Sequence, residues 1–228
     1  DIFDEASEGA IKNFSVNLSH LLMGAPLKGK TVLGLAPGYR TGCKLAVVDK
    51  TGKVLDTAVI YPTKPQERIE ESAREVSALI EKYKVDIIAI GNGTASKESE
   101  IFIADTIKKY GGKVKYSMVS EAGASIYSAS KLAADEFPDF DVTQRSAVSI
   151  ARRIQDPLAE LVKIEPRSIG VGQYQHDMNQ KRLGEALGGV VEDCVNSVGV
   201  DINTASPSLL VRVSGLTAAT AKNIVAFR

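Results

Sequence analysis

The feature that most constrains the fold is a change of hydrophobic period near residue 31. Before it, apolar residues such as Ile11, Phe14 and Leu18 recur at helical spacing, and APLKGK then breaks the pattern. After it, the apolar runs TVLGLA and CKLAVVD flank the turn PGYRTG, and a turn over 50–52 leads into KVLDTAVIY. Short apolar runs joined by glycine-containing turns predict three antiparallel strands.

Helices and strands alternate in the next part of the chain. Thr63 and Gln66 predict a capping box, after which Ala73 and Val76 lie on one helical face. The strand VDIIAIG, a helix over about 96–110 and the strand VKYSMVS complete two crossover units. Their apolar runs suit strands that are covered on both faces, as in a parallel or mixed sheet.

Further helical stretches follow the last strand. GASIYSASKLAADEF predicts one, and a second begins after Asp141 and should end near Gln155, because Pro157 lacks an amide proton. Three antiparallel strands followed by helix, strand, helix, strand and helices is the plan of the α/β ribonuclease H-like fold. We therefore expect a mixed sheet with helices on both faces.

Composition excludes several classes of function. Lys and Arg number 28, equal to the 28 Asp and Glu, so the overall field does not attract nucleic acid and any such contact must be local. No apolar run approaches the roughly 20 residues that span a bilayer, and no secretory signal is present. We expect a cytoplasmic protein without membrane contact, whose two cysteines, Cys43 and Cys194, are reduced and buried. The chain lacks an initial methionine and ends directly after a helical pattern, so we expect a fragment.

The C-terminal segment INTASPSLLVRVSGLTAATAKNIVAFR predicts a helix-hairpin-helix. Ser206 is positioned to cap the first helix, 213–217 forms the hairpin, and Ala221 and Ile224 pack the second helix. Such a hairpin presents backbone amides to a phosphate and grips the nucleic-acid backbone without reading bases. A structural hairpin that only docks domains is the alternative. The predicted nucleic-acid contacts are Arg212, Ser214, Gly215, Thr217 and Lys222, together with Arg40 of the first turn, which is equally a solvated loop arginine.

The longest blocks of sequence resemble the Tex family of bacterial transcription accessory proteins. They are LGLAPGYRTGCKLAVVD, IAIGNGTAS, VSEAGASIYSAS, VSIARRIQDPLAELVKIEPRSIGVGQYQHD and VVEDCVNSVGVDINTAS. The resemblance implies the end of a helical domain over 1–30, a YqgF domain related to RuvC resolvases over 31–164, and a truncated helix-hairpin-helix region over 165–228. It also implies an S1 RNA-binding domain beyond this chain, and RNA or DNA as partners. Thr217 is a departure, since strong DNA-binding hairpins usually carry a second glycine there.

The resemblance also locates where a nuclease of this fold would hold its metals. Such enzymes bind two divalent cations, which prefer carboxylate ligands, at the end of the first strand, at a later strand and on a helix. The matching positions are Ala36, Glu121 and Asp156. Ala36 replaces the Asp usual in the family and cannot ligate a metal, so Glu121 and Asp156 are vestigial catalytic and metal candidates.

Each of these residues has a simpler structural explanation. Glu121 suits the first turn of the helix that it begins, and Asp156 suits an N-cap before Pro157. The segment 91–94 suits a phosphate cradle or a plain strand-to-helix turn.

The leading hypothesis is a noncatalytic nucleic-acid-binding core of a Tex-type protein. The alternatives are a RuvC-like nuclease disabled by Ala36, a scaffold that docks RNA polymerase or ribosome, and an actin-like ATPase, which needs a second lobe. No cofactor is expected, and Mg²⁺ would bind only if the nuclease site were restored.

Overall fold

The computed structural model describes residues 2–110 and 113–228. It divides into two compact units, a sheet unit (residues 26–156) and a helical unit (residues 1–25 and 157–228). This division falls between Asp156 and Pro157. The predicted domain boundary at residue 164 stays a prediction.

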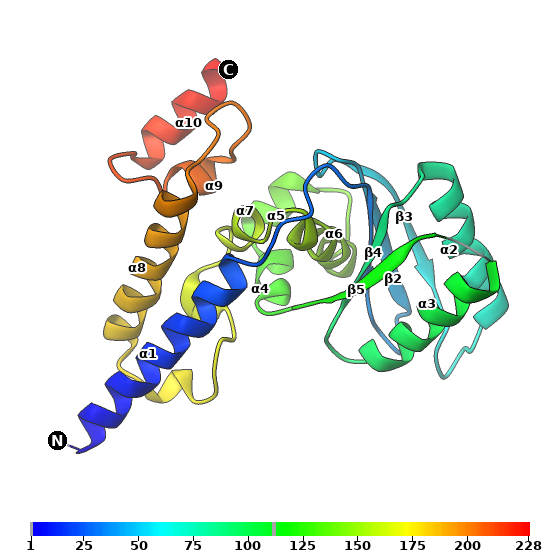
Figure 1. Cartoon of the computed structure of the whole chain (residues 1–228), viewed down its shortest axis with the longest axis horizontal. Coiled ribbons are helices and arrows are strands. Elements are labelled where there is room, and N and C mark those ends of the chain that lie inside the picture. The colour runs from blue at the N-terminus through cyan, green and yellow to red at the C-terminus, as the bar shows by residue number, and fades with distance from the viewer. Residues whose placement is uncertain (1, 111–112) are drawn as a thin grey trace. The chain divides into compact units, whose positions relative to one another are not determined.

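The sheet unit is built on a five-stranded mixed sheet of order β3-β2-β1-β4-β5 (Figure 1). β1 pairs antiparallel with β2 and parallel with β4, while β2 pairs antiparallel with β3 and β4 parallel with β5. The predicted antiparallel meander and the two crossover units are confirmed. The strands are β1 (Val32–Ala36), β2 (Cys43–Val48), β3 (Val54–Ile60), β4 (Ile87–Gly91) and β5 (Lys115–Val119).

Helices cover both faces of this sheet. α2 and α3 lie on one face and α6 crosses the other, with the short helices α4 and α5 beside α6 (Figure 1). Side chains alternate between the two faces along β1. Leu33 and Leu35 face α2 and α3, whereas Val32 and Ala36 face α6, so both helical layers pack on this strand. The helices are α2 (Ile69–Tyr83), α3 (Ser96–Tyr110), α4 (Ala124–Ala129), α5 (Lys131–Glu136) and α6 (Val142–Gln155).

α6 approaches the sheet closely at Gly34 of β1. A Cβ added to Gly34 would lie 2.8 Å from the Cβ of Ala151 and closer still to the carbonyl oxygen of Ala147. The helix begins with a capping box, in which the Asp141 side chain accepts from the Gln144 amide and the Gln144 side chain accepts from the Asp141 amide. It ends at Gln155, as Pro157 predicts.

Two local predictions were wrong. Thr63 and Gln66 form no capping box, because Glu67 has φ +47°, which an α-helix cannot contain, and α2 therefore begins only at Ile69. The Gln66 amide instead donates to the Arg40 carbonyl oxygen at 3.1 Å. GASIYSASKLAADEF is also not one helix, since Ser130 is extended (ψ 157°) and its hydroxyl caps α5.

The helical unit packs its long helices against each other. α1 lies along α8 (Figure 1), and it buries Ile11, Phe14 and Leu18 on the predicted apolar face. Within the described residues, no helix is both long and apolar enough to span a membrane. The helices are α1 (Ile2–Leu22), α7 (Pro157–Leu161), η1 (Pro166–Ser168), η2 (Gln175–Asp177), α8 (Gln180–Val198), α9 (Pro207–Leu210) and α10 (Ala218–Phe227).

Both cysteines are free and buried, as predicted. Burial raises the pKa of the Cys43 thiol above its ordinary value, and its hydrogen bonds with the Ser99 hydroxyl and to the Gly38 carbonyl oxygen offset this rise only in part. Cys43 therefore remains a neutral core residue rather than a reactive thiolate.

Candidate functional site

Ala36 lies at the carboxyl end of β1, where the residue is 8% exposed and packs on the α6 side of the sheet. Its antiparallel partner on β2 is Lys44. Directly opposed residues of two paired strands point to the same face of the sheet. A nuclease of this fold would carry a carboxylate at position 36. In this chain, the residue beside that position on the same face of the sheet is Lys44.

Lys44 is buried, with 9% of its surface exposed. Its ammonium nitrogen donates to the Thr41 carbonyl oxygen at 2.9 Å, which fixes the turn that follows β1. The Lys44 charge also acts on the carboxyl group of Asp141. Burial alone would raise the pKa of that carboxyl, but hydrogen bonds from Gln144 and Thr143, together with the Lys44 charge, hold the pKa below its usual value. Sequence analysis missed Lys44, although a lone lysine in the apolar run CKLAVVD was a usable signal.

Glu121 does not begin a helix, because α4 starts at Ala124 with Gly123 as its N-cap. Its carboxylate lies against the backbone that follows β4. A Cβ on Gly91 would lie 2.7 Å from the Glu121 Cδ, and one on Gly93 would lie 2.9 Å from it. These glycines leave space for the Glu121 side chain, so a carboxyl group already occupies the place predicted as a phosphate cradle.

The environment of Glu121 favours its neutral form. Burial raises the pKa of its carboxyl above the ordinary value, and the nearby Arg153 guanidinium opposes this rise only in part. Its amide donates to the Asn92 side-chain oxygen at 2.9 Å, so the segment is tied to the β4–α3 turn.

Arg153 holds the Glu121 segment from α6. It is 4% exposed, and its Nη1 donates to the carbonyl oxygens of Ser120 at 2.8 Å and Ala122 at 2.7 Å. These two carbonyls flank Glu121 on either side. Arg153 was not among the predicted site residues, but it follows the buried Ile150 by three positions, and an arginine on the apolar face of a helix was the available signal.

Asp156 is the C-cap of α6, and its amide donates to the Arg152 carbonyl oxygen at 2.9 Å. Its carboxylate lies 3.7 Å from the Lys28 ammonium nitrogen. Among the described residues, no three His, Cys, Asp or Glu side chains come together in a way that could hold a metal ion. Two-metal hydrolysis requires several converging carboxylates.

The predicted helix-hairpin-helix is present in the helical unit. The Ser206 hydroxyl caps α9 by accepting from the Leu209 amide at 3.2 Å, and the buried Ala221 joins α10 to α9, both as predicted. Gly215 has φ +85°, a left-handed conformation that makes the turn between the two helices.

Thr217 acts as the N-cap of α10. Its hydroxyl accepts from the Thr220 amide at 3.1 Å, so one of the free amides at this helix start is occupied by the protein itself. No partner lies within the described part of the chain for four further backbone amides, those of Gly215, Thr217, Ala218 and Ala219.

Asn196 of α8 fixes the hairpin and was not predicted. Its side-chain oxygen accepts from the Ser214 amide at 3.1 Å, and its side-chain nitrogen donates to the Arg212 carbonyl at 3.3 Å. The Ser214 amide, a predicted phosphate contact, is therefore already in use.

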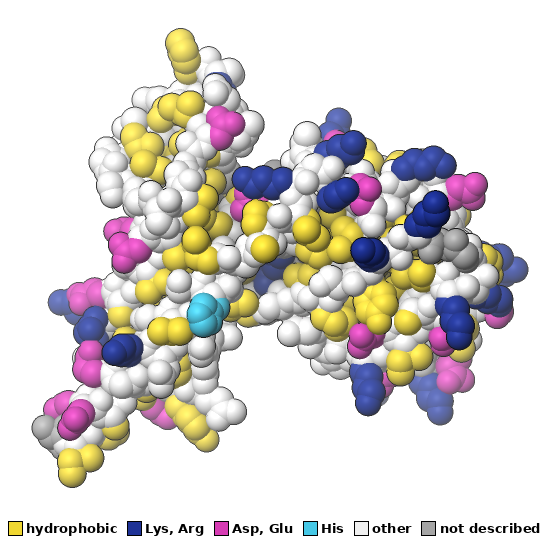
Figure 2. Space-filling view, in the orientation of Figure 1, with side chains coloured by type: hydrophobic (Ala, Val, Ile, Leu, Met, Phe, Trp, Pro, Cys, Tyr) yellow, Lys and Arg dark blue, Asp and Glu magenta, His cyan; other side chains and the backbone are white. Residues whose placement is uncertain are grey.

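The charged side chains of this region are few. Lys222 is exposed on α10, while Arg212 is half-buried. On the face drawn in Figure 2, the α9–α10 region shows mostly hydrophobic and uncharged side chains, whereas Lys and Arg are spread over the sheet unit. Arg40 is exposed in the sheet unit, in the turn after β1.

Family models match the sheet unit and the C-terminal part of the helical unit. The family model of the Tex protein YqgF-like domain matches residues 30–155, and that of the helix-hairpin-helix motif matches residues 195–228. With the strand order, this confirms the ribonuclease H-like fold followed by a helical hairpin region. A RuvC structure from Thermus thermophilus aligns over 58% of this chain and 95% of that chain, with a TM-score of 0.38 and 18% identity.

Curated relatives match almost the whole chain. Protein tex of Bordetella pertussis is 60% identical over 226 residues, which is 99% of this chain and 29% of the relative. Protein YhgF of Escherichia coli is 58% identical over the same shares of the two chains. Human S1 RNA-binding domain-containing protein 1 is 49% identical over 98% of this chain and 23% of its own length. The chain thus spans less than a third of these relatives, and it belongs to the Tex family.

Proposed function

We propose that this chain is a noncatalytic, nucleic-acid-binding core of a Tex-type transcription accessory protein. The observation that carries the proposal is the α9–α10 hairpin, where four backbone amides with no partner among the described residues lie at the start of a helix of 10 residues. Backbone amides at a helix N-terminus, together with its dipole, favour a phosphate.

The binding mode follows from the donors. Backbone amides contact phosphate oxygens and read no base, so affinity should vary little with sequence. Asn196 supports the mode by holding Ser214 and Arg212 in place before any ligand arrives. Lys222 adds a single exposed positive charge on α10.

Three features of the sheet unit support the absence of catalysis. A methyl group stands at position 36, Lys44 lies beside it, and the Glu121 carboxylate is turned against the Gly91 backbone. We place the protein in the cytoplasm, with RNA or DNA as its partner and without a metal cofactor.

Fluorescence anisotropy with labelled 20-nucleotide RNA, single-stranded DNA and duplex DNA tests the proposal over a KCl series. The log of affinity should fall linearly with log salt because bound phosphates release counterions. Lys222→Ala should weaken binding and reduce that slope by about 0.7 for single strands or about 0.9 for duplex. Lys181→Ala, at an exposed position of α8 outside the hairpin, is the matched control and should leave both unchanged. Absence of binding to all three probes at low salt would refute the proposal.

A further inference from the structure

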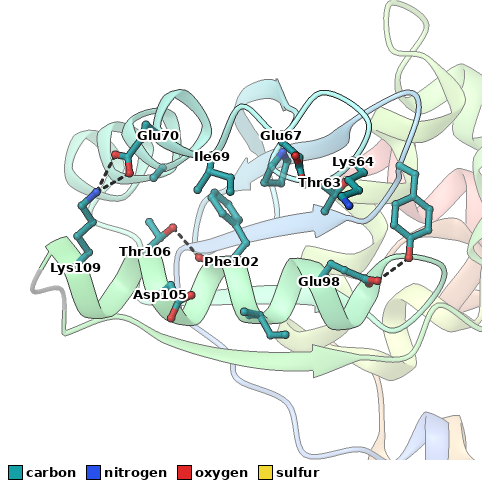
Figure 3. A pocket seen from close by; sticks show the side chains of 14 residues that line it. Thr63, Lys64, Glu67, Ile69, Glu70, Glu98, Phe102, Asp105, Thr106 and Lys109 are labelled. Atoms are coloured by element: carbon teal, nitrogen blue, oxygen red, sulfur yellow. Dashed lines mark hydrogen bonds and ion pairs between the residues drawn. The ribbon is translucent and has the colours of Figure 1, made fainter.

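A cavity of about 570 Å³ lies on the sheet face opposite α6, between α2, α3 and the loops that follow β1 and β3 (Figure 3). Its size is within the roughly 300–1,000 Å³ typical of ligand pockets. We call it the α2–α3 groove. Its floor includes Ala73 of α2 and Phe102 of α3, both members of the hydrophobic core.

Two side-chain links close the ends of the α2–α3 groove (Figure 3). At one end Lys109 Nζ lies 2.8 Å from both carboxylate oxygens of Glu70, and at the other the Tyr39 hydroxyl donates to Glu98 at 2.9 Å. Glu98 and Lys109 are eleven residues apart on α3, which is about 16 Å along the helix axis. The groove is therefore long enough for about three turns of a helix.

The opening of the groove carries large apolar side chains. Ile69 of α2 is 51% exposed and Ile101 of α3 is 54% exposed, and both line the cavity. An apolar floor with an apolar rim is the arrangement that receives the apolar face of an amphipathic segment.

One buried polar atom in the groove is unsatisfied. Thr63 lines the cavity and is 8% exposed, and its hydroxyl oxygen has no hydrogen-bond partner among the described residues. A polypeptide supplies both amide donors and carbonyl acceptors, so a bound segment can satisfy this hydroxyl.

The charges in the groove select the kind of partner. Four acidic residues and two lysines line it, and one of those lysines is paired with Glu70. Glu67 and Asp105, two of the acidic residues, are exposed to solvent at the groove. This excess of negative charge repels phosphate and attracts Lys or Arg.

We propose that the α2–α3 groove binds a segment of a partner protein in which two or more apolar side chains stand next to a Lys or Arg. The apolar side chains bury against Phe102 and Ile101, and the cation pairs with Asp105. This surface serves protein docking and is separate from the amides of the α9–α10 hairpin that we assign to nucleic acid.

The test is selection of peptides from a phage-displayed library of random 12-residue sequences on the 228-residue chain. Selected sequences should combine apolar residues with Lys or Arg, and their affinities are then measured by anisotropy of the labelled synthetic peptides. Asp105→Lys and Ile101→Asn should each weaken binding by about tenfold, through charge reversal and loss of apolar contact. Thr63→Val should weaken peptide binding several-fold while leaving the thermal stability unchanged or raised, because the hydroxyl makes no hydrogen bond within the described part of the chain.

Matched controls are Glu81→Lys on α2 and Ile126→Asn on α4, both exposed and outside the groove, and neither should alter affinity. The proposal is overturned if no peptide is enriched, if enriched peptides lack a cation, or if the groove variants bind as the controls do. Binding of a 12-nucleotide RNA that is lost in Ile101→Asn and strengthened in Asp105→Lys, or self-association that is lost in Ile101→Asn, would replace the peptide with another occupant and overturn the proposal as well.

Discussion

Substitution of Gly34 by alanine should destabilise the sheet unit, because α6 rests on the backbone of β1 at this residue. The added Cβ would lie 2.8 Å from the Ala151 Cβ and would overlap the Ala147 carbonyl oxygen. Carbon atoms in contact are normally about 3.5–4.0 Å apart, so α6 must retreat by about 1 Å. That retreat cannot be confined to one side chain, because the obstacle is helix backbone.

The expected loss of stability in Gly34→Ala depends on the contacts between α6 and the sheet. A gap of about 1 Å forfeits up to about half of each dispersion contact along the interface, and overpacking a core position by one carbon costs about 1–3 kcal/mol. The interface includes Val148 and Ile150, which are fully buried against the sheet. We expect a loss of about 3 kcal/mol in the free energy of unfolding, equivalent to about 6–12 °C in the melting temperature.

Calorimetry measures the melting temperature, and hydrogen exchange read by mass spectrometry locates the loss to β1 and α6. Gly189→Ala is the matched control: nothing lies within 4 Å of its added Cβ inside α8, so it should stabilise the chain by about 0.5–1 kcal/mol. Glycine-to-alanine substitution is thus expected to lower the free energy of unfolding at position 34 and to raise it at position 189. If Gly34→Ala retained the parent melting temperature and the exchange protection of α6, the close-approach argument would be wrong.

Two further predictions concern Ala36 and Glu121. Ala36→Asp should gain no Mg²⁺-dependent cleavage of branched DNA or RNA, because the new carboxylate faces Lys44 across the β1–β2 pair; cleavage in a gel assay would show that the remaining site is competent. Glu121→Gln should melt at a higher temperature than the parent chain at pH 7, and the difference should shrink as the pH is lowered to about 4. Because burial raises the folded pKa of Glu121, its stabilising neutral form is fully present below the unfolded value of about 4.3 and is lost as the pH rises through the folded value. A parent chain that melts above the Gln variant at pH 7 would contradict the assigned burial cost.

Patterns of the sequence predicted most of the architecture. The short apolar runs predicted the strands, and the buried face of α1 followed from helical spacing. Pro157 and Ser206 marked helix ends correctly, because a missing amide proton and a capping hydroxyl act within one turn of the chain. The capping box predicted from Thr63 and Gln66 was wrong, because the left-handed backbone of Glu67, directly after the motif, is not visible in the sequence.

Some features of the candidate sites could also be read from the sequence, whereas others could not. The sequence by itself determined that position 36 carries no carboxylate, that the Gly215 hairpin joins two helices and that the order of strands and helices along the chain suits a ribonuclease H-like fold. Only the tertiary structure decided that Lys44 lies beside Ala36, that Arg153 holds both sides of Glu121 and that α2 and α3 leave a groove between them. Periodicity and capping depend on residues within a few positions of one another, whereas burial, pKa and cavities depend on segments that the chain brings together from 8 to more than 30 residues apart.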